Sequence, residues 1–175
     1  MDFQKLISAR YSVRQFKQER LKQEDIDKIL DAGHRAPTGC NYQPQRILVL
    51  NTEQSMDKLR KCTKCHFHAP TAMLICYNKE ESWIRPYDKA LSAPVDAAIV
   101  ATHMMLAAHD TGVGCCWVMH FDPLAMRETF HIPQNIEPAA LLVMGYPSPD
   151  AKPLELHEKF RPMHEVIFYD DFCKE

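Results

Sequence analysis

Residues 93–110 constrain the fold most strongly, because they read as a helix that is apolar on nearly every side. Alanine and other small residues dominate this stretch, and Asp96 and His103 interrupt it. A helix without a broad polar face has to be covered by other elements, so we expect it at the centre of a packed domain. The two polar residues argue against a membrane span, which needs about 20 predominantly apolar residues in a row.

Shorter apolar runs alternate with amphipathic stretches through the rest of the 175 residues. The predicted strands are residues 47–50, 72–77, 115–119, 139–144 and 165–169. The further predicted helices are residues 2–9, 23–35, 52–62 and 123–130. This alternation predicts a single α/β or α+β domain, and the chain is long enough to bury a substantial core.

Composition limits the classes of partner. The formal net charge of −2 gives no basic surface, so neither nucleic acid nor a membrane is an expected partner. Seven cysteines without a secretory pattern at the N-terminus indicate free thiols in a reducing compartment, and we expect a cytoplasmic protein. The five glycines form neither G-x-G-x-x-G nor a Walker-type loop. Any bound nucleotide is therefore held without a glycine-rich phosphate loop.

The connection between the second predicted helix and the first predicted strand is rich in polar side chains and turn-forming residues. It reads A-P-T-G-C-N-Y-Q-P-Q-R over residues 36–46, and each proline disfavours helix in the residue before it. Gly39 permits a positive φ or the close approach of another group. Thr38, Asn41 and Gln43 supply hydrogen-bond donors and acceptors suited to a flat heteroaromatic ligand. On composition alone, an ordinary helix-to-strand connection rich in turn-forming residues is the favoured interpretation of this stretch.

A second polar stretch follows the N-terminal helix. Arg10, Ser12 and Arg14 are spaced two apart, so in an extended segment their side chains point to the same side. Two guanidinium groups and a hydroxyl on one side can bind a phosphate. The alternative interpretation is a solvated basic edge strand.

Cysteine and histidine gather in a third stretch, residues 62–68, which reads C-T-K-C-H-F-H. C-x-x-C-H is the pattern of c-type haem attachment, and Cys62, Cys65, His66 and His68 are groups that ligate zinc. Haem attachment is not expected without an export signal. Four zinc ligands within seven residues are closer together than the usual spacing, so we expect uncoordinated thiols and no metal site.

These stretches together resemble the FMN-dependent nitroreductases of the small type. The resemblance runs from end to end of the chain, and it rests on the order and spacing of pieces that are each weak alone. The pieces are A-R-Y-S-V-R-Q-F at 9–16, A-P-T-G-C-N-Y-Q-P-Q-R at 36–46, A-P at 69–70, V-D-A-A at 95–98, G-V-G-C-C-W-V at 112–118, G-Y-P at 145–147, and the basic pair Lys159 and Arg161.

The resemblance implies a fold and an assembly. The fold is a three-layer α+β sandwich in which helices flank a central, mostly antiparallel sheet, with one FMN-binding domain over residues 1–175. The assembly is an intertwined homodimer in which the long helix forms much of the interface. Residues 162–175 would reach over the partner subunit. An exposed apolar helix and a strand at 165–169 without a neighbour are independent reasons to expect a dimer.

The resemblance also implies that FMN binds at the dimer interface. The N-terminal stretch would hold the phosphate and ribityl chain, and the basic pair would add phosphate contacts. The 37–43 loop would lie along the isoalloxazine ring of the flavin bound mainly by the partner chain, and the backbone at 117–118 would touch the ring. The implied cofactor-binding residues are Arg10, Tyr11, Ser12, Arg14, Pro37, Thr38, Gly39, Cys40, Asn41, Gln43, Trp117, Val118, Lys159 and Arg161.

The implied activity is a ping-pong transfer of reducing equivalents from NADH or NADPH through the flavin to a nitroaromatic, a quinone or a similar small oxidant. No side chain is required as nucleophile or general base, so no catalytic residue is named. Cys40 departs from the small residue that the resemblance leads us to expect there. The alternatives are a flavin carrier or sensor without efficient turnover, a specialised enoate or quinone reductase of the same fold, and a thiol or metal-binding protein.

Overall fold

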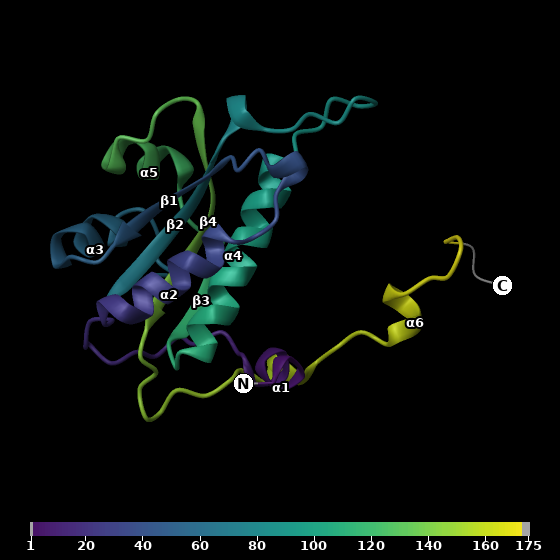
Figure 1. Ribbon diagram of the computed structural model, residues 1–175. Helices are drawn as coiled ribbons and strands as arrows, with labels where there is room; N and C mark the ends of the chain where they lie inside the picture. The colour runs from purple at the N-terminus through teal and green to yellow at the C-terminus, as the bar shows by residue number, and fades with distance from the viewer. Residues whose placement is uncertain (1, 173–175) are drawn as a thin grey trace.

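Four antiparallel strands form the centre of the computed structural model, which describes residues 2–172 (Figure 1). Their order across the sheet is β1-β2-β4-β3. The strands are β1 (Gln45–Leu50), β2 (Thr71–Asn78), β3 (Gly114–Val118) and β4 (Ile136–Gly145). The α-helices are α1 (Phe3–Ala9), α2 (Gln23–His34), α3 (Glu53–Arg60), α4 (Ala93–Asp110), α5 (Pro123–Phe130) and α6 (Met163–Val166). Short 3-10 helices are η1 (Gly39–Asn41), η2 (Lys79–Glu81) and η3 (Glu155–Glu158).

Helices cover both faces of the sheet, and the side chains of the central strands alternate between two cores. Leu74 of β2 packs in a core with Met56 of α3 and Met126 of α5. The next residue, Ile75, packs on the opposite face with Ile29 of α2 and with α4. Successive strand residues point to opposite faces, so the continuous apolar run in β2 reflects a strand buried on both sides. The predicted three-layer α+β sandwich is confirmed, and all four of its strands pair antiparallel.

The long apolar helix has the predicted bounds, but one side of it is not covered within this chain. Gly33 of α2 lets the two helices approach closely, since a Cβ there would come within 2.7 Å of the Met104 side chain. On the other side Val95 is 63% exposed, and Ile99 and Leu106 on the same face are half-buried. Apolar side chains at this spacing form a continuous stripe along the helix. Within residues 2–172, no helix has the length and apolar character that a membrane span requires.

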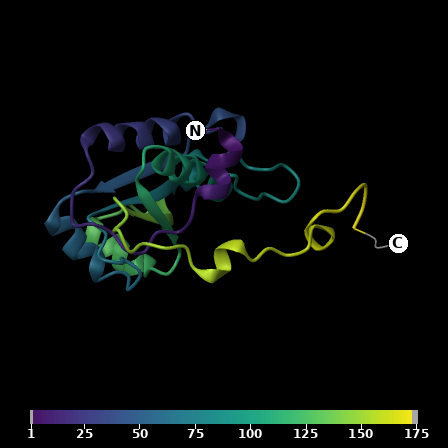
Figure 2. The same ribbon diagram turned by 90° about the horizontal axis from the view of Figure 1, so that it is seen from below.

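The predicted strand at 165–169 is wrong. The structure has α6 over the first two of these positions and neither helix nor strand over 167–169; a hydrogen bond of 2.8 Å from the Ile167 N–H to the Met163 carbonyl closes the helix. The physical reason is that a strand needs a neighbouring strand for its ladder, and this segment has none among the residues that the structure describes. Both views show the chain beyond β4 extending away from the sheet (Figures 1 and 2).

This C-terminal arm, residues 154–172, exposes large apolar side chains along its whole length. Phe160 is 85% exposed, and the others of this kind are Leu154, Leu156, Met163, Val166, Ile167, Phe168, Tyr169 and Phe172. A run of exposed apolar side chains of this size is typical of a segment that docks on another surface. Of the predicted reach over residues 162–175, the last three positions lie outside the described residues.

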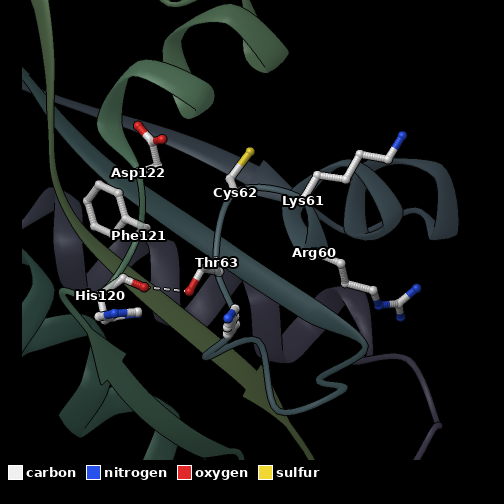
Figure 3. A pocket seen from close by; sticks show the side chains of 8 residues that line it. Arg60, Lys61, Cys62, Thr63, His120, Phe121 and Asp122 are labelled. Carbon is white, nitrogen blue, oxygen red and sulfur yellow. Dashed lines mark hydrogen bonds between the residues drawn. The ribbon is translucent and has the colours of Figure 1, made fainter.

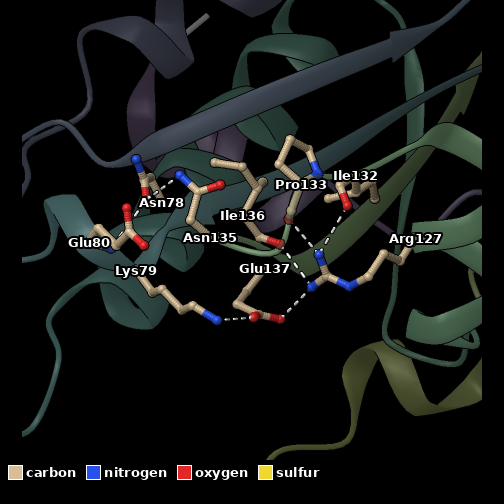
Figure 4. A network of polar contacts seen from close by, with 9 residues as sticks. All are labelled: Asn78, Lys79, Glu80, Arg127, Ile132, Pro133, Asn135, Ile136 and Glu137. Atoms are coloured by element: carbon tan, nitrogen blue, oxygen red, sulfur yellow. Dashed lines mark hydrogen bonds and ion pairs between the residues drawn. The ribbon is translucent and has the colours of Figure 1, made fainter.

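One side chain holds the connection between α5 and β4 (Figure 4). The Arg127 guanidinium donates hydrogen bonds to the carbonyls of Ile132, Pro133 and Ile136 and pairs with Glu137 at 2.9 Å. Lys79 pairs with the other oxygen of the same carboxylate at 3.1 Å. The α5 end needs such support, because His131 after it adopts a left-handed φ of 53°. The network is therefore structural, and it fixes the start of β4, an inner strand of the sheet.

Candidate functional site

The N-terminal stretch forms a basic pocket of about 250 Å3 at the C-terminal end of α4. Residues 10–16 are extended here, with an isolated parallel bridge between Ser12 and Cys115 of β3. Val13 points the other way and is buried in the core. Arg10, Ser12 and Arg14 line one pocket as the spacing predicts, but Tyr11 lines it too, so the alternation is not strict. The pocket is lined by Arg10, Tyr11, Ser12, Arg14, Leu154, Leu156 and His157.

Neighbouring groups fix the side chains of this pocket. Arg14 Nη1 donates to the Ser12 carbonyl at 3.0 Å, and the guanidinium carbon lies 5.8 Å from the centre of the Phe67 ring. The Tyr11 hydroxyl donates to the Ala151 carbonyl at 3.3 Å. Within residues 2–172, neither Arg10 nor Arg14 forms an ion pair with a carboxylate. Both guanidinium groups keep their charge available for an anionic ligand.

The charge of the pocket reaches two neighbouring titratable groups. Burial lowers the pKa of His109 in the last turn of α4, and the Arg10 guanidinium lowers it further. Burial raises the pKa of the Cys116 thiol on β3, and the Arg14 guanidinium opposes that rise. Both groups therefore lie within electrostatic range of the two arginines of the pocket.

A larger pocket, of about 480 Å3, lies between the α3–β2 and β3–α5 connections (Figure 3). The Thr63 hydroxyl donates to the His120 carbonyl and accepts the Cys65 N–H at 2.9 Å. This arrangement brings the Cys65 sulfur to 3.9 Å from His120 Nδ1. In Figure 3 the charged ends of Arg60 and Lys61 point away from His120.

Sequence reasoning had considered Cys65 only as a thiol or metal ligand, and had not singled out Phe67 and His120 as site residues. The structure places Phe67 against Arg14 and Cys65 against His120. No local pattern pointed to these positions, because the contacts join segments that are far apart in the sequence.

The four candidate zinc ligands do not converge. The Cys62 sulfur is buried against Lys58 and Thr129, whereas Cys65 faces His120. The His66 and His68 rings contact each other edge to face, with centroids 4.7 Å apart. Across the part of the chain that the structure describes, no three His, Cys, Asp or Glu side chains are grouped as a metal site requires.

The 37–43 loop lies at the opposite, N-terminal end of α4. Cys40, Asn41 and Gln43 are exposed and adopt φ values of 49°, 57° and 51°. Three left-handed conformations at non-glycine residues within four positions are strained, because each Cβ crowds the backbone. Gly39 is not left-handed, but a Cβ on it would lie 2.9 Å from Ser92 Oγ. The predicted close approach at Gly39 is thus confirmed, and the positive φ values fall on its neighbours.

A buried carboxylate that sequence reasoning had not placed in the site supports this loop. Asp96 Oδ1 accepts the Gly39 N–H at 2.9 Å, and Oδ2 accepts the Ser92 hydroxyl at 2.8 Å. The signal in the sequence was a charged residue in the first turn of an otherwise apolar helix. Its partner lies 57 positions away, which no local pattern reveals.

The remaining predicted residues lie in β3 and in the loop. Trp117 and Val118 end β3 and do not line the basic pocket: Val118 is buried in one core, and Trp117 packs against the core on the opposite face of the sheet. Pro37 and Thr38 belong to the loop, and the Thr38 hydroxyl accepts the Gln43 N–H at 3.1 Å. With 18 residues, α4 separates the pocket from the loop by about 27 Å, so one chain does not bring them together.

Lys159 and Arg161 lie in the C-terminal arm and do not line the basic pocket. Lys159 pairs with Glu155, and Arg161 pairs with Glu165 at 3.4 Å. Both ion pairs are exposed, so they hold these side chains only weakly. Their contact with a phosphate stays a prediction.

Comparison with known proteins identifies the family. Residues 7–74 and 64–146 match the model of the nitroreductase family. The chain belongs to the nitroreductase family. The crystal structure of a nitroreductase family protein from Clostridium difficile 630 is 38% identical, has a TM-score of 0.92, and aligns over 98% of this chain and 99% of that one.

Two further relatives add detail about other members. A protein from Archaeoglobus fulgidus named as an NADH dehydrogenase/NAD(P)H nitroreductase is 28% identical over 90% of this chain and 92% of its own. An FMN-dependent nitroreductase from Clostridium difficile R20291 has a TM-score of 0.78 at 23% identity, over 95% of this chain and 98% of that one. At this identity, the second comparison concerns the fold alone.

Proposed function

We propose that this nitroreductase family member is an FMN-dependent oxidoreductase that takes reducing equivalents from NADH or NADPH and delivers them to a nitroaromatic, a quinone or a similar small oxidant. The observation that carries the proposal is the basic pocket, in which Arg10 and Arg14 lack carboxylate partners within residues 2–172. The named activity of the Archaeoglobus fulgidus relative supports the oxidoreductase assignment.

The residues of the pocket fit the phosphate end of FMN. The two guanidinium groups offer paired donors for phosphate oxygens, and the Ser12 hydroxyl adds a third donor on the same side. When bound, FMN supplies the hydride and electron chemistry. The protein's contribution is binding, orientation and the exclusion of competing groups, so we assign no side chain as an acid, base or nucleophile.

A homodimer completes the proposed site. The uncovered stripe of Val95, Ile99 and Leu106 offers a second copy an apolar face along α4. In a two-fold dimer with antiparallel α4 helices, the N-terminal end of one helix lies beside the C-terminal end of the other. The loop of one subunit then meets the basic pocket of its partner. The exposed apolar side chains of the arm supply further surface for the same partner.

The free thiols support a cytoplasmic location, which we also propose. Within residues 2–172 all the cysteines are unpaired: Cys40, Cys62, Cys65, Cys76, Cys115 and Cys116. Such a set is typical of a reducing compartment.

The test is an absorption spectrum of the purified protein, recorded anaerobically before and after NADPH and then NADH are added. We expect a flavin spectrum that either donor bleaches and that a nitroaromatic or a quinone restores. A flavin spectrum that neither donor bleaches would contradict the enzyme and favour a flavin carrier or sensor. A colourless protein that does not bind added FMN would refute the proposal.

A further inference from the structure

Asp96 is a buried carboxylate, and each of its two oxygens accepts a hydrogen bond. It is 3% exposed, and no cation pairs with it within residues 2–172. A charge buried without a counter-ion requires strong hydrogen bonds in compensation. Asp96 accepts them from the Gly39 N–H and from the Ser92 hydroxyl, at 2.9 and 2.8 Å. Its position in the first turn of α4 adds the favourable interaction of an anion with the positive end of the helix dipole.

The Gly39 bond is the hydrogen bond that joins the strained loop to α4. The other hydrogen bonds of residues 38–43 stay within the loop or come from Arg46 nearby. Bonds within a loop do not fix where it lies against the rest of the protein. Left-handed residues such as Cys40 and Asn41 persist only where the surroundings over-determine the conformation. The Asp96 carboxylate is the group placed to do this.

Packing at the same point leaves the loop little freedom. A Cβ on Gly39 would meet both Ser92 Oγ at 2.9 Å and Trp83 Cβ at 3.4 Å. The Ser92 hydroxyl is itself held by Asp96. A loop pressed against α4 in this way presents the exposed Cys40, Asn41 and Gln43 outward, in one conformation.

We propose that Asp96 is a positioning residue: its carboxylate locks the 38–43 loop in the left-handed conformation that contacts the flavin ring bound by the partner subunit. The inference rests on the proposed function for its ligand, but the locking itself concerns this chain alone. The loop is thereby ordered before the cofactor arrives, which lowers the entropic cost of binding.

The test compares Asp96→Ala with Asp96→Asn. Asparagine keeps an oxygen for the Gly39 N–H, and its amide donates to the Ser92 oxygen, so the lock survives. Alanine removes both bonds. In FMN-free protein, we expect hydrogen exchange at the Gly39 amide to stay slow in the wild type and in Asp96→Asn, and to accelerate at least tenfold in Asp96→Ala. This arm involves no cofactor.

The second arm measures the bound flavin. We expect Asp96→Ala to weaken FMN binding about tenfold and to change the visible circular dichroism of the flavin, with Asp96→Asn within twofold of the wild type. Binding of inorganic phosphate, measured by competition with FMN, should be equal in all three proteins, because the basic pocket is untouched.

The matched control is Ser82→Ala. The Ser82 hydroxyl accepts the Ala93 N–H at 3.0 Å and lies 3.5 Å from Ser92 Oγ, so this change weakens the same helix start while it removes neither hydrogen bond of Asp96. We expect it to lower the melting temperature and to leave the Gly39 exchange and the flavin signals unchanged. Equal effects in Ser82→Ala and Asp96→Ala, or slow Gly39 exchange in Asp96→Ala, would overturn the inference. A wild-type protein that binds no FMN but shows the predicted exchange pattern would refute the proposed function and leave the lock intact.

Discussion

The surfaces at the two ends of α4 differ in charge and in how they are held in place. At the C-terminal end, an extended segment presents two guanidinium groups that no carboxylate pairs within residues 2–172. At the N-terminal end, a strained loop presents uncharged polar groups and is held by a buried carboxylate. The first surface suits a phosphate, and the second suits the edge of a flat neutral ring. The comparison teaches that one chain keeps these two surfaces at opposite ends of α4, and that the proposed homodimer is what joins them as two halves of one site.

The largest expected effect comes from separating the half-sites with Val95→Glu. Val95 is exposed in the single chain, so the fold should tolerate the change, but an interface along α4 would bury the new charge. We expect a monomer that binds FMN at least a hundredfold more weakly. Light scattering and FMN titration measure both effects.

The matched control for that variant is Leu124→Glu. Leu124 is 71% exposed and also lies in the first turn of a helix, so the effect on the helix dipole is the same. We expect it to stay dimeric and yellow. A dimeric Val95→Glu protein with bound flavin would contradict the proposed interface.

Arg127→Ala should destabilise the fold without changing the basic pocket or the 37–43 loop. The Arg127 side chain is 16% exposed and donates to three carbonyls and one carboxylate, so its loss leaves partly buried acceptors without this donor. We expect the free energy of unfolding to fall by about 2–4 kcal/mol, with FMN affinity of the folded protein unchanged. Urea denaturation and FMN titration check the two halves of this statement. A large loss of FMN affinity in Arg127→Ala would show that FMN binding follows the overall stability of the fold and not the two surfaces at the ends of α4.

Arg14→Ala weakens one half-site. Because a charge-assisted contact to phosphate disappears, FMN affinity should fall between about tenfold and a hundredfold, and the dimer should persist. Lys28→Ala removes an equally charged, exposed side chain of α2 that pairs with Glu24, and should change affinity less than twofold. Unchanged flavin occupancy in Arg14→Ala would remove the phosphate assignment.

The smallest effect concerns the protonation of His109. Its pKa is held below the ordinary value, mainly by burial and then by Arg10. The unfolded chain therefore binds more protons, and His109 should reduce stability as pH falls through the ordinary histidine pKa of about 6.5. A phosphate bound at Arg10 should raise the pKa of His109, which NMR titration with and without inorganic phosphate measures. If phosphate left the pKa of His109 unchanged, the anion would not bind next to Arg10.

The sequence predicted most of the fold, because its elements carry local signals. The bounds of α4 and α5 matched, and α5 is marked by the Asp122 cap followed by Pro123. The strand at 165–169 failed because a ladder depends on a neighbouring strand and not on the residues themselves.

The basic pocket of the candidate site could also be predicted from the sequence. The spacing of Arg10, Ser12 and Arg14 predicted one shared side because alternation is a property of extended backbone. The contact of Asp96 with Gly39 was not predictable, because it joins residues 57 positions apart. A long-range contact that fixes a strained loop produces no periodic pattern in the sequence.

Subunit complementation tests the central account most directly. Arg14→Ala disables the basic pocket, and Gly39→Val disables the loop, because its Cβ would lie 2.9 Å from Ser92 Oγ. Each variant alone should bind FMN weakly. After the two are unfolded together and refolded, the mixed dimers should contain one intact site, and FMN titration should reveal about one tight site per mixed dimer. A mixture that binds no better than its parents would contradict the account that two chains build each site.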